Sequence, residues 1–469
     1  MMKHAKKPIC SERKAAVLII AMIFILVFSM FALSMAAMSG TSVEVSSNQH
    51  KINAALAAAQ SGLEVMRYYL SDMTIRGTVQ PQNRLATVAS QLRTRFADAC
   101  MTDVTVYYDT APDTVTISTI PLDSQSNKAF TASLSYAYAD DCDTMQLDVN
   151  GSSQQVYRRI QANYNFAATG NDVFDFGVAS KGPLYMSGQA ELGGVNLAIE
   201  ASVYIEGDWV TSDAFSITNN ASVAGDVSIA NPYSTYSAAA GSSVGGAIGE
   251  AIADHVHIGV EYVDFPTPNP EYFRAFATGE QLDEDSEWDS HAVLNNVVIK
   301  ANADPTFAGN VTINGILFIE APNVVHFGGK CTVNAIIVAA GDVTDTSGTN
   351  SISFAGQVVC NDISTLQGEQ FEAIKQETGT FILAPGFGMA FSGQALAMSG
   401  AIAANGISFS GQAGGTINGS LINYASTPTT LGGQSSLMFN RSGRETNPAG
   451  FVSDNVLEFQ PSSYSEIPF

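Results

Sequence analysis

Two histidines and an aspartate in the stretch "ADHVHIG" have side chains that ligate metal ions. They are Asp254, His255 and His257. On a β-strand, residues two apart share a face, so both imidazoles would point the same way. No further ligand follows at a recognised zinc spacing, and ordinary surface side chains are the alternative interpretation. We therefore keep a metal site here as a weak hypothesis and predict no cofactor.

A second candidate is the acidic stretch "DEDSEWD". Asp283, Asp285, Glu287 and Asp289 alternate with other residues, as acids do in a calcium-binding loop. The stretch lacks the glycine at position 6 and the closing glutamate of an EF-hand. A solvated acidic loop is the simpler interpretation.

Catalysis on polysaccharides would need a different set of charges. Residues 168–469 contain seven basic and 31 acidic side chains, a balance of −24 (7 − 31). Such a surface repels polyanionic sugars and nucleic acids, because both are held by Lys and Arg. No paired-acid motif recurs in the sequence repeat. The sequence also contains no glycine-rich phosphate-binding loop and no serine nucleophile elbow. The sequence predicts a protein that is no enzyme and binds no nucleic acid; a carbohydrate-active enzyme is the alternative.

The N-terminus carries a long apolar run behind a basic segment. Residues 1–14 contain five basic side chains and one acidic side chain, and the 24 residues from Ala15 to Met38 contain no charge. About 20 helical residues span a hydrocarbon core, whereas a signal-peptide core is shorter. The basic cluster places the N-terminus in the cytoplasm and the rest outside it. Cleavage at "SMAAMSG" is the alternative. The anchor residues that mark the run are Ala15, Leu18, Ile23, Phe28, Leu33 and Met38.

Helical periodicity continues after the apolar run. Apolar residues recur at alternating spacings of four and three, which predicts one stripe along a helix that extends to about Ser71. We expect this stripe to pack against a sheet. Its residues are Ile52, Leu56, Ala59, Leu63, Met66 and Leu70.

A basic start, then "AAVLIIAMIFILVFSMFALSMAAMS", then "AAAQSGLEVMRYYL" resembles the PilX-type N-terminal region of type IV pilus assembly proteins and minor pilins. Gln60 stands where that family typically has Glu in an Ala-Ala-Glu-Ala-Gly-Leu run. The chain also lacks the glycine and the acid that flank the cut in major prepilins. The resemblance covers about residues 10–165 and implies a helix packed on a small antiparallel sheet. An ordinary single-pass anchor with an unrelated domain is the alternative.

Residues 103–165 read as strands, because Val, Thr, Tyr and Phe dominate between turn residues. Cys100 and Cys142 flank this predicted sheet. In an oxidising compartment they could form a disulfide, and two free thiols are the alternative.

The rest of the chain contains a repeated sequence motif. A Phe-x-Gly motif recurs, with spacings of 20 and 18 residues between some neighbours, and a weaker copy begins at Met186. Strand-rich repeats of this period predict a right-handed parallel β-helix, in which the recurring aromatic rings face inward and stack. A β-sandwich is the alternative. The predicted ladder consists of Phe307, Phe327, Phe354, Phe391 and Phe409.

The predicted fold is mainly β, with one long N-terminal helix, a pilin-like α+β module and then the β-helix. The boundaries are a cytoplasmic segment at 1–14, a transmembrane helix at 15–38, the pilin-like module at 39–167, the β-helix at 168–450 with an insertion at about 232–290, and a tail at 451–469.

This organisation predicts a single-pass, exported type IV pilus assembly protein or minor pilin that displays its β-helix for adhesion or partner binding. Its expected partners are the inner membrane, other pilins or assembly proteins, and surface glycans or ligands on host or neighbouring cells. An envelope scaffold that polymerises through the β-helix ends is a further alternative.

Overall fold

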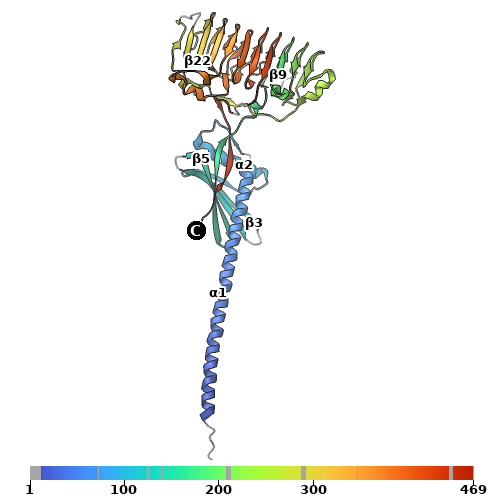
Figure 1. Cartoon of the computed structure of the whole chain (residues 1–469). Helices are drawn as coiled ribbons and strands as arrows, with labels where there is room; N and C mark the ends of the chain where they lie inside the picture. The colour runs from blue at the N-terminus through green and yellow to red at the C-terminus, as the bar shows by residue number, and fades with distance from the viewer. Residues whose placement is uncertain are drawn as a thin grey trace, which may run out of the picture. The chain divides into compact units, whose positions relative to one another are not determined.

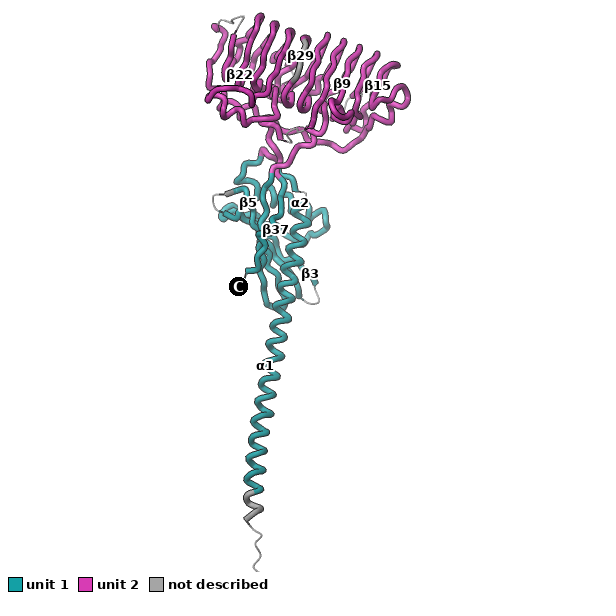
Figure 2. The backbone as a smooth tube through the Cα atoms, in the orientation of Figure 1, with its two compact units in different colours: residues 1–75, 79–167, 456–469 teal, residues 76–78, 168–455 magenta. Residues whose placement is uncertain are grey.

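The computed structural model describes residues 12–71, 73–123, 127–138, 141–207, 213–286, 292–345, 347–442 and 447–467. The chain forms two compact units, coloured separately in Figure 2. Unit 1 comprises residues 1–75, 79–167 and 456–469, and unit 2 comprises residues 76–78 and 168–455.

Unit 1 is built on the helix α1 (Glu12–Leu70), whose 59 residues extend about 88 Å at 1.5 Å per residue. Its C-terminal part packs on a sheet, and its N-terminal part continues beyond that sheet (Figure 1). The helix approaches strand β5 (Asp141–Ser153) closely, because a Cβ at Gly151 would collide with the backbone of Ala55 and Ala59. Small residues at this contact therefore let the stripe reach the sheet.

The sheet of unit 1 has seven strands in the order β1-β37-β6-β5-β4-β3-β2. Neighbours from β2 to β6 pair antiparallel. The remaining bounds are β1 (Thr74–Ile75), β2 (Val106–Thr110), β3 (Asp113–Asp123), β4 (Lys128–Tyr138), β6 (Val156–Ala168) and β37 (Asn455–Ile467).

The last strand corrects the predicted domain boundaries. Residues 451–469 are not a tail, because β37 lies between β1 and β6 in the sheet. The chain thus leaves unit 1 at residue 167 and returns to it at residue 456. Unit 2 is inserted between two neighbouring strands of one sheet.

The helix α2 (Arg84–Asp98) was not predicted, and it explains why the proposed disulfide is wrong. Cys100 and Cys142 are both free thiols. Arg84, at the start of α2, donates a hydrogen bond to the Cys142 carbonyl at 3.2 Å, whereas Cys100 follows the far end of the helix. The 15 residues of α2 span about 22 Å at 1.5 Å per residue, and a disulfide needs Cα atoms within about 7 Å.

Unit 2 is a stack of coils whose strands pair in parallel, an arrangement consistent with a parallel β-helix (Figure 1). We call it the coil stack. One side is a nine-stranded sheet in the order β14 (Thr235–Ala238), β11 (Asp213–Ile217), β8 (Leu184–Met186), β34 (Thr429–Leu431), β31 (Ile407–Phe409), β28 (Gly388–Phe391), β25 (Ser351–Phe354), β23 (Val324–Phe327) and β21 (Thr306–Phe307).

The other sides belong to a 19-stranded sheet. Its strands are β7 (Val178–Ser180), β9 (Glu191–Gly194), β10 (Val203–Ile205), β12 (Ser222–Val223), β13 (Val227–Ile229), β15 (Ser243–Val244), β16 (Ala247–Ile248), β17 (Val256–Ile258), β19 (Gln281–Leu282), β20 (Val293–Ile299), β22 (Val311–Glu320), β24 (Cys331–Ala340), β26 (Val358–Cys360), β27 (Thr380–Ala384), β29 (Gln394–Met398), β30 (Ala401–Ala404), β32 (Gly414–Ile417), β33 (Leu421–Asn423) and β35 (Ser436–Phe439). A two-stranded pair, β18 (Thr267–Pro268) with β36 (Phe451–Val452), lies outside both sheets.

The coils do not follow one another in sequence order. The first coil pairs on one side with the second coil, where Leu184 aligns with Phe215. On its other side it pairs with the last coil, where Leu184 aligns with Thr429. The chain therefore enters in the middle of the coil stack, builds outward, crosses to the opposite end and builds back to its own first coil. We call this first-to-last contact the seam.

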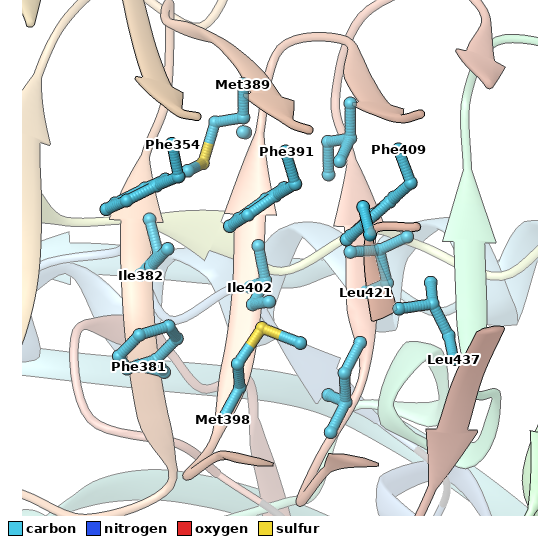
Figure 3. Packing of buried hydrophobic residues seen from close by; sticks show 14 of the residues in the cluster. Phe354, Phe381, Ile382, Met389, Phe391, Met398, Ile402, Phe409, Leu421 and Leu437 are labelled. Atoms are coloured by element: carbon cyan, nitrogen blue, oxygen red, sulfur yellow. The ribbon is translucent and has the colours of Figure 1, made fainter. Parts of the chain in front are cut away.

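Inside the coil stack, the five recurring phenylalanines form one continuous ladder. Their ring centroids are 4.8–5.2 Å apart and their planes differ by no more than 9°. Figure 3 shows the rings of Phe354, Phe391 and Phe409 beside Ile382 and Ile402 from the facing sheet. The aligned inward positions continue across the seam, where aliphatic side chains replace the phenylalanines. These are Leu431, Met186 and Ile217.

A second apolar layer covers one outer side of the coil stack. Outward residues such as Ile336 and Val338 lie in one buried cluster with Phe273 and Phe371, and Tyr204 packs against Phe176 and Phe265. Phe273 lies in η5 (Pro270–Phe276) within the predicted insertion, and Phe371 lies in η7 (Glu369–Phe371). The insertion is thus a cover, and a second covering segment at 361–379 was not predicted. The other short helices are η1 (Pro81–Asn83), η2 (Asp172–Asp175), η3 (Ala198–Ala201), η4 (Gly249–His255), η6 (Ile363–Thr365) and η8 (Ile374–Gln376).

Candidate functional site

The N-terminal half of α1 is an apolar surface, and no other part of the chain that the structure describes packs on it. Leu18, Ile23, Phe28, Leu33 and Met38 are each 56–71% exposed. The side chain of Ala15 lies outside the described residues. Apolar side chains surround the helix, as in a membrane span and unlike the one-sided stripe of a surface helix. By length and composition, this segment is suited to be a membrane span or a signal sequence.

The C-terminal half of α1 carries the predicted packing stripe. Ala59, Leu63, Met66 and Leu70 are buried in the core of unit 1. Leu56 is half-buried against the same core, and Ile52, nearest the apolar half, is also half-buried. The helix α1 therefore has two chemically distinct halves. The apolar side chains of the C-terminal half are buried against the sheet of unit 1, whereas those of the N-terminal half need an apolar environment that a membrane or another protein would supply.

The coil stack presents rows of small polar groups on the outer side of the nine-stranded sheet. Aligned outward positions hold Thr306, His326 and Ser353 on neighbouring strands. The His326 Nδ1 atom lies 2.8 Å from the Ser353 hydroxyl oxygen. Further along, the Ser237 hydroxyl donates to that of Ser216 at 2.9 Å. Hydroxyl side chains predominate in this row, which His326 and Ala390 interrupt.

Side-chain amides form ladders along the coil edges. Asn295, Asn314, Asn334 and Asn361 are linked by hydrogen bonds of 2.9, 2.9 and 2.6 Å. A second run joins Asn418, Asn440 and Asn196 at 3.1 and 3.2 Å, and a third joins Gln412, Gln434 and Gln189 at 3.5 and 3.2 Å. These residues were not among the predicted site residues. The signal was present, because asparagine recurs seven residues after Phe307, Phe327 and Phe354.

The predicted metal candidates are arranged differently from a metal site. His255 Nδ1 lies 2.7 Å from one oxygen of Asp226, and His257 Nε2 lies 3.5 Å from the other. Both imidazoles therefore contact a carboxylate that the sequence did not point to, and Asp254 is exposed. In the part of the chain that the structure describes, no group of three or more His, Cys, Asp or Glu side chains is placed to hold a metal ion.

The predicted acidic loop is only partly described. Asp283 accepts a hydrogen bond from the Ser286 hydroxyl at 2.9 Å, and Asp285 is exposed. Glu287 and Asp289 lie outside the described residues. The Asp283 contact closes a local turn, and calcium binding by this stretch stays a prediction.

The cysteines of unit 2 fill space in the coil stack. Cys331 is buried, and Cys360 packs against the same core. Burial raises the pKa of the Cys331 thiol to about 12 and also raises the pKa of Cys360, so both stay protonated near neutral pH. Both side chains therefore act as small apolar groups in the core.

Glu200 joins the two coils that meet at the seam. Its carboxylate accepts hydrogen bonds from the backbone N–H of Asn196 at 2.7 Å, of Leu197 at 3.2 Å and of Arg441 at 3.2 Å. Burial alone would raise the pKa of Glu200, but these hydrogen bonds outweigh it and lower the pKa to about 2.

We expect Glu200→Gln to weaken the seam in a pH-dependent way. Because the folded pKa is below the ordinary value, the carboxylate stabilises the fold fully above about pH 4.5, and this contribution is lost as pH falls toward about 2. Hydrogen exchange at residues 196–201 should therefore be faster in the variant at neutral pH, and the difference should shrink on acidification. The exposed Glu250→Gln is the control. A difference between wild type and variant that does not change with pH would contradict this role.

Comparisons with known proteins identify no family. No protein-family model matches the chain, and no curated protein sequence matches it. Among solved structures, the competence-associated pilin ComZ from Thermus thermophilus aligns with 74% of this chain and 86% of its own, at 12% identity and a TM-score of 0.24. A domain of ice-binding protein 1 from Shewanella frigidimarina aligns with 59% of this chain and 99% of its own, at 13% identity and a TM-score of 0.19. TM-scores this low do not establish a shared fold.

Proposed function

We propose that this chain is an exported, membrane-anchored type IV pilus assembly protein or minor pilin. In this proposal the apolar half of α1 lies in the inner membrane and packs against the helices of other pilins. Unit 2 is a right-handed parallel β-helix displayed outside the cytoplasm for adhesion or partner binding, with no catalytic role of its own.

The observation that carries the proposal is the division of α1. Its C-terminal half is buried on an antiparallel sheet, while Val17 to Val43 remains exposed and without charge. A helix of this kind, with a sheet on one half only, is the plan that the sequence resemblance implied. Lipid, or a bundle of similar helices, is the environment that satisfies such an all-round apolar surface.

Orientation follows from the charges at the two ends of the apolar half. Lys3, Lys6, Lys7, Arg13 and Lys14 precede it, and the first charge after it is Glu44. Positive residues are retained on the cytoplasmic side of a membrane. The part of unit 1 that follows the apolar half of α1, and all of unit 2, would then lie outside the cytoplasm.

The surface of the coil stack supports a binding role for unit 2. Hydroxyl rows and amide ladders repeat at the spacing of parallel strands, about 4.8 Å. Such a surface offers many weak, equivalent hydrogen-bonding groups and suits an extended partner such as a glycan.

A reporter fused after Phe469 tests the topology. We expect a reporter that is active only in the periplasm to be active, and one that is active only in the cytoplasm to be inactive. Replacing Lys3, Lys6, Lys7, Arg13 and Lys14 with glutamate should reduce export, because the positive charge bias sets the orientation. An active cytoplasmic reporter on the wild-type chain would refute the proposal.

A further inference from the structure

A polar cavity of about 250 Å³ lies within unit 2, apart from the outer faces described above. Segments distant in sequence line it: residues 76–78, the start of the coil stack, the 262–267 part of the cover, and Asp454. Pockets for drug-sized ligands are usually 300–1,000 Å³, so this cavity suits a smaller molecule.

The cavity has a fixed frame. The Tyr424 hydroxyl donates to the Pro266 carbonyl at 2.6 Å, and the Val263 N–H donates to the Tyr204 hydroxyl at 2.9 Å. Both tyrosines are buried. Asn171 Nδ2 donates to the Asp264 carbonyl at 2.9 Å. These bonds hold the 262–267 segment on the coil stack, so the cavity is formed by anchored backbone.

Charges of both signs face the cavity. The cations are Arg76 and Lys181, and the carboxylates are Glu206, Asp264 and Asp454. Within the described residues, no ion pair joins any two of them, so each opposite-charge pair is more than 4.0 Å apart.

Two of these groups have partners that fix their positions. The Lys181 ammonium lies 5.2 Å from the centre of the Phe265 ring, a cation–π contact. Asp454 accepts a hydrogen bond from the Gly77 N–H at 2.9 Å, which ties residues 76–78 to the site.

Glu206 is more buried than Arg76 and Asp264, which are both exposed. It is half-buried, and burial raises the pKa of its carboxyl above the ordinary value. The nearby Lys181 ammonium acts in the opposite direction, and the Asp264 carboxylate raises the pKa further. A cationic group on a ligand would stabilise this carboxylate strongly, because the carboxylate is partly removed from water.

We propose that this cavity binds a small zwitterion that carries an amine and a carboxylate. The ligand carboxylate lies toward Lys181 and Arg76, and the ammonium lies toward Glu206 and Asp264. A metal ion is disfavoured by the two cations, and a simple anion by the three carboxylates. The inference does not depend on the proposed pilus role.

Calorimetric titration of the full chain in detergent micelles tests the proposal. The probes are glycine, β-alanine and 4-aminobutyrate, which differ in the distance between their charges, with acetate and methylamine as probes of one charge each. We expect at least one zwitterion to bind, and both single-charge probes to bind about tenfold more weakly or not at all. Binding by none of the three zwitterions would overturn the proposal, and so would equal binding of acetate.

Three variants locate the site. Glu206→Gln and Lys181→Met should each weaken binding of the zwitterion by about tenfold or more, because each removes a charge-assisted contact. Glu261→Gln, an exposed carboxylate just before the 262–267 segment, should leave it unchanged. Circular dichroism at the titration temperature shows that each variant is folded. Unchanged affinity in folded Glu206→Gln and Lys181→Met would place the binding elsewhere and refute the assignment.

Discussion

Replacing Phe327 by alanine will lower the free energy of unfolding of unit 2 by about 3–5 kcal/mol, as for other buried aromatics. The ring is 1% exposed and stacks between Phe307 at 5.0 Å and Phe354 at 4.8 Å. Each coil is supported mainly by its neighbours, so the loss should spread along the ladder. Hydrogen exchange read by mass spectrometry should show faster exchange in the strands of Phe307 and Phe354 as well.

The matched control for this change is Tyr233→Ala, which truncates an aromatic side chain of unit 2 that is 73% exposed. It should change the stability by less than about 0.5 kcal/mol. An effect of Phe327→Ala confined to its own strand, or no larger than that of Tyr233→Ala, would mean that the ladder does not couple the coils.

Gly329→Val should destabilise the same coil through the backbone. A Cβ at Gly329 would collide with the carbonyl of Gly309, in the preceding coil, and a Cβ at Gly356 would collide in the same way with the Gly329 carbonyl. The coils pass each other at these glycines with no room for a side chain. Hydrogen exchange around Gly309 should therefore rise, although no buried apolar surface has been removed.

Replacing Leu63 by aspartate will unfold unit 1. Leu63 is 5% exposed in the core between α1 and the sheet, and burying an unpaired carboxylate there costs several kcal/mol. Limited proteolysis should then cut the sheet strands between residues 106 and 168 in the variant and spare them in the wild type.

Ser61→Asp is the matched control, because Ser61 is exposed two residues away on the same helix. It introduces the same charge outside the core and should leave protease resistance unchanged. If Leu63→Asp were as resistant as Ser61→Asp, the stripe would not be packed on the sheet.

Local patterns in the sequence predicted individual helices and strands better than they predicted which of these elements pack together. The alternating stripe from Ile52 to Leu70 and the recurring phenylalanines each report one face of one element, and the structure has both. The helix α2 carried a comparable signal at Leu85, Val88 and Leu92, which we did not use. The omission led directly to the wrong disulfide.

Pairing between distant segments could not be predicted in the same way. The strand β37 pairs beside β6, although nearly 300 residues separate them, and its own pattern does not show which edge it joins. The same holds for the seam, where Val178 aligns with Leu421. Periodicity shows that a segment is a strand but carries no information on which strand lies next to it. The cavity charges, brought together from four segments, were out of reach for the same reason.

Photo-crosslinking from α1 tests the central proposal most directly. A photoreactive amino acid is placed at Phe28, which is 67% exposed, and in a second strain at Tyr233 in unit 2. Irradiation of intact, piliated cells should link position 28, and not position 233, to the N-terminal helix of another pilin or assembly protein, identified by mass spectrometry. Adducts to no such protein from position 28, with the chain present at normal levels in the membrane, would contradict a pilin-like role for this helix.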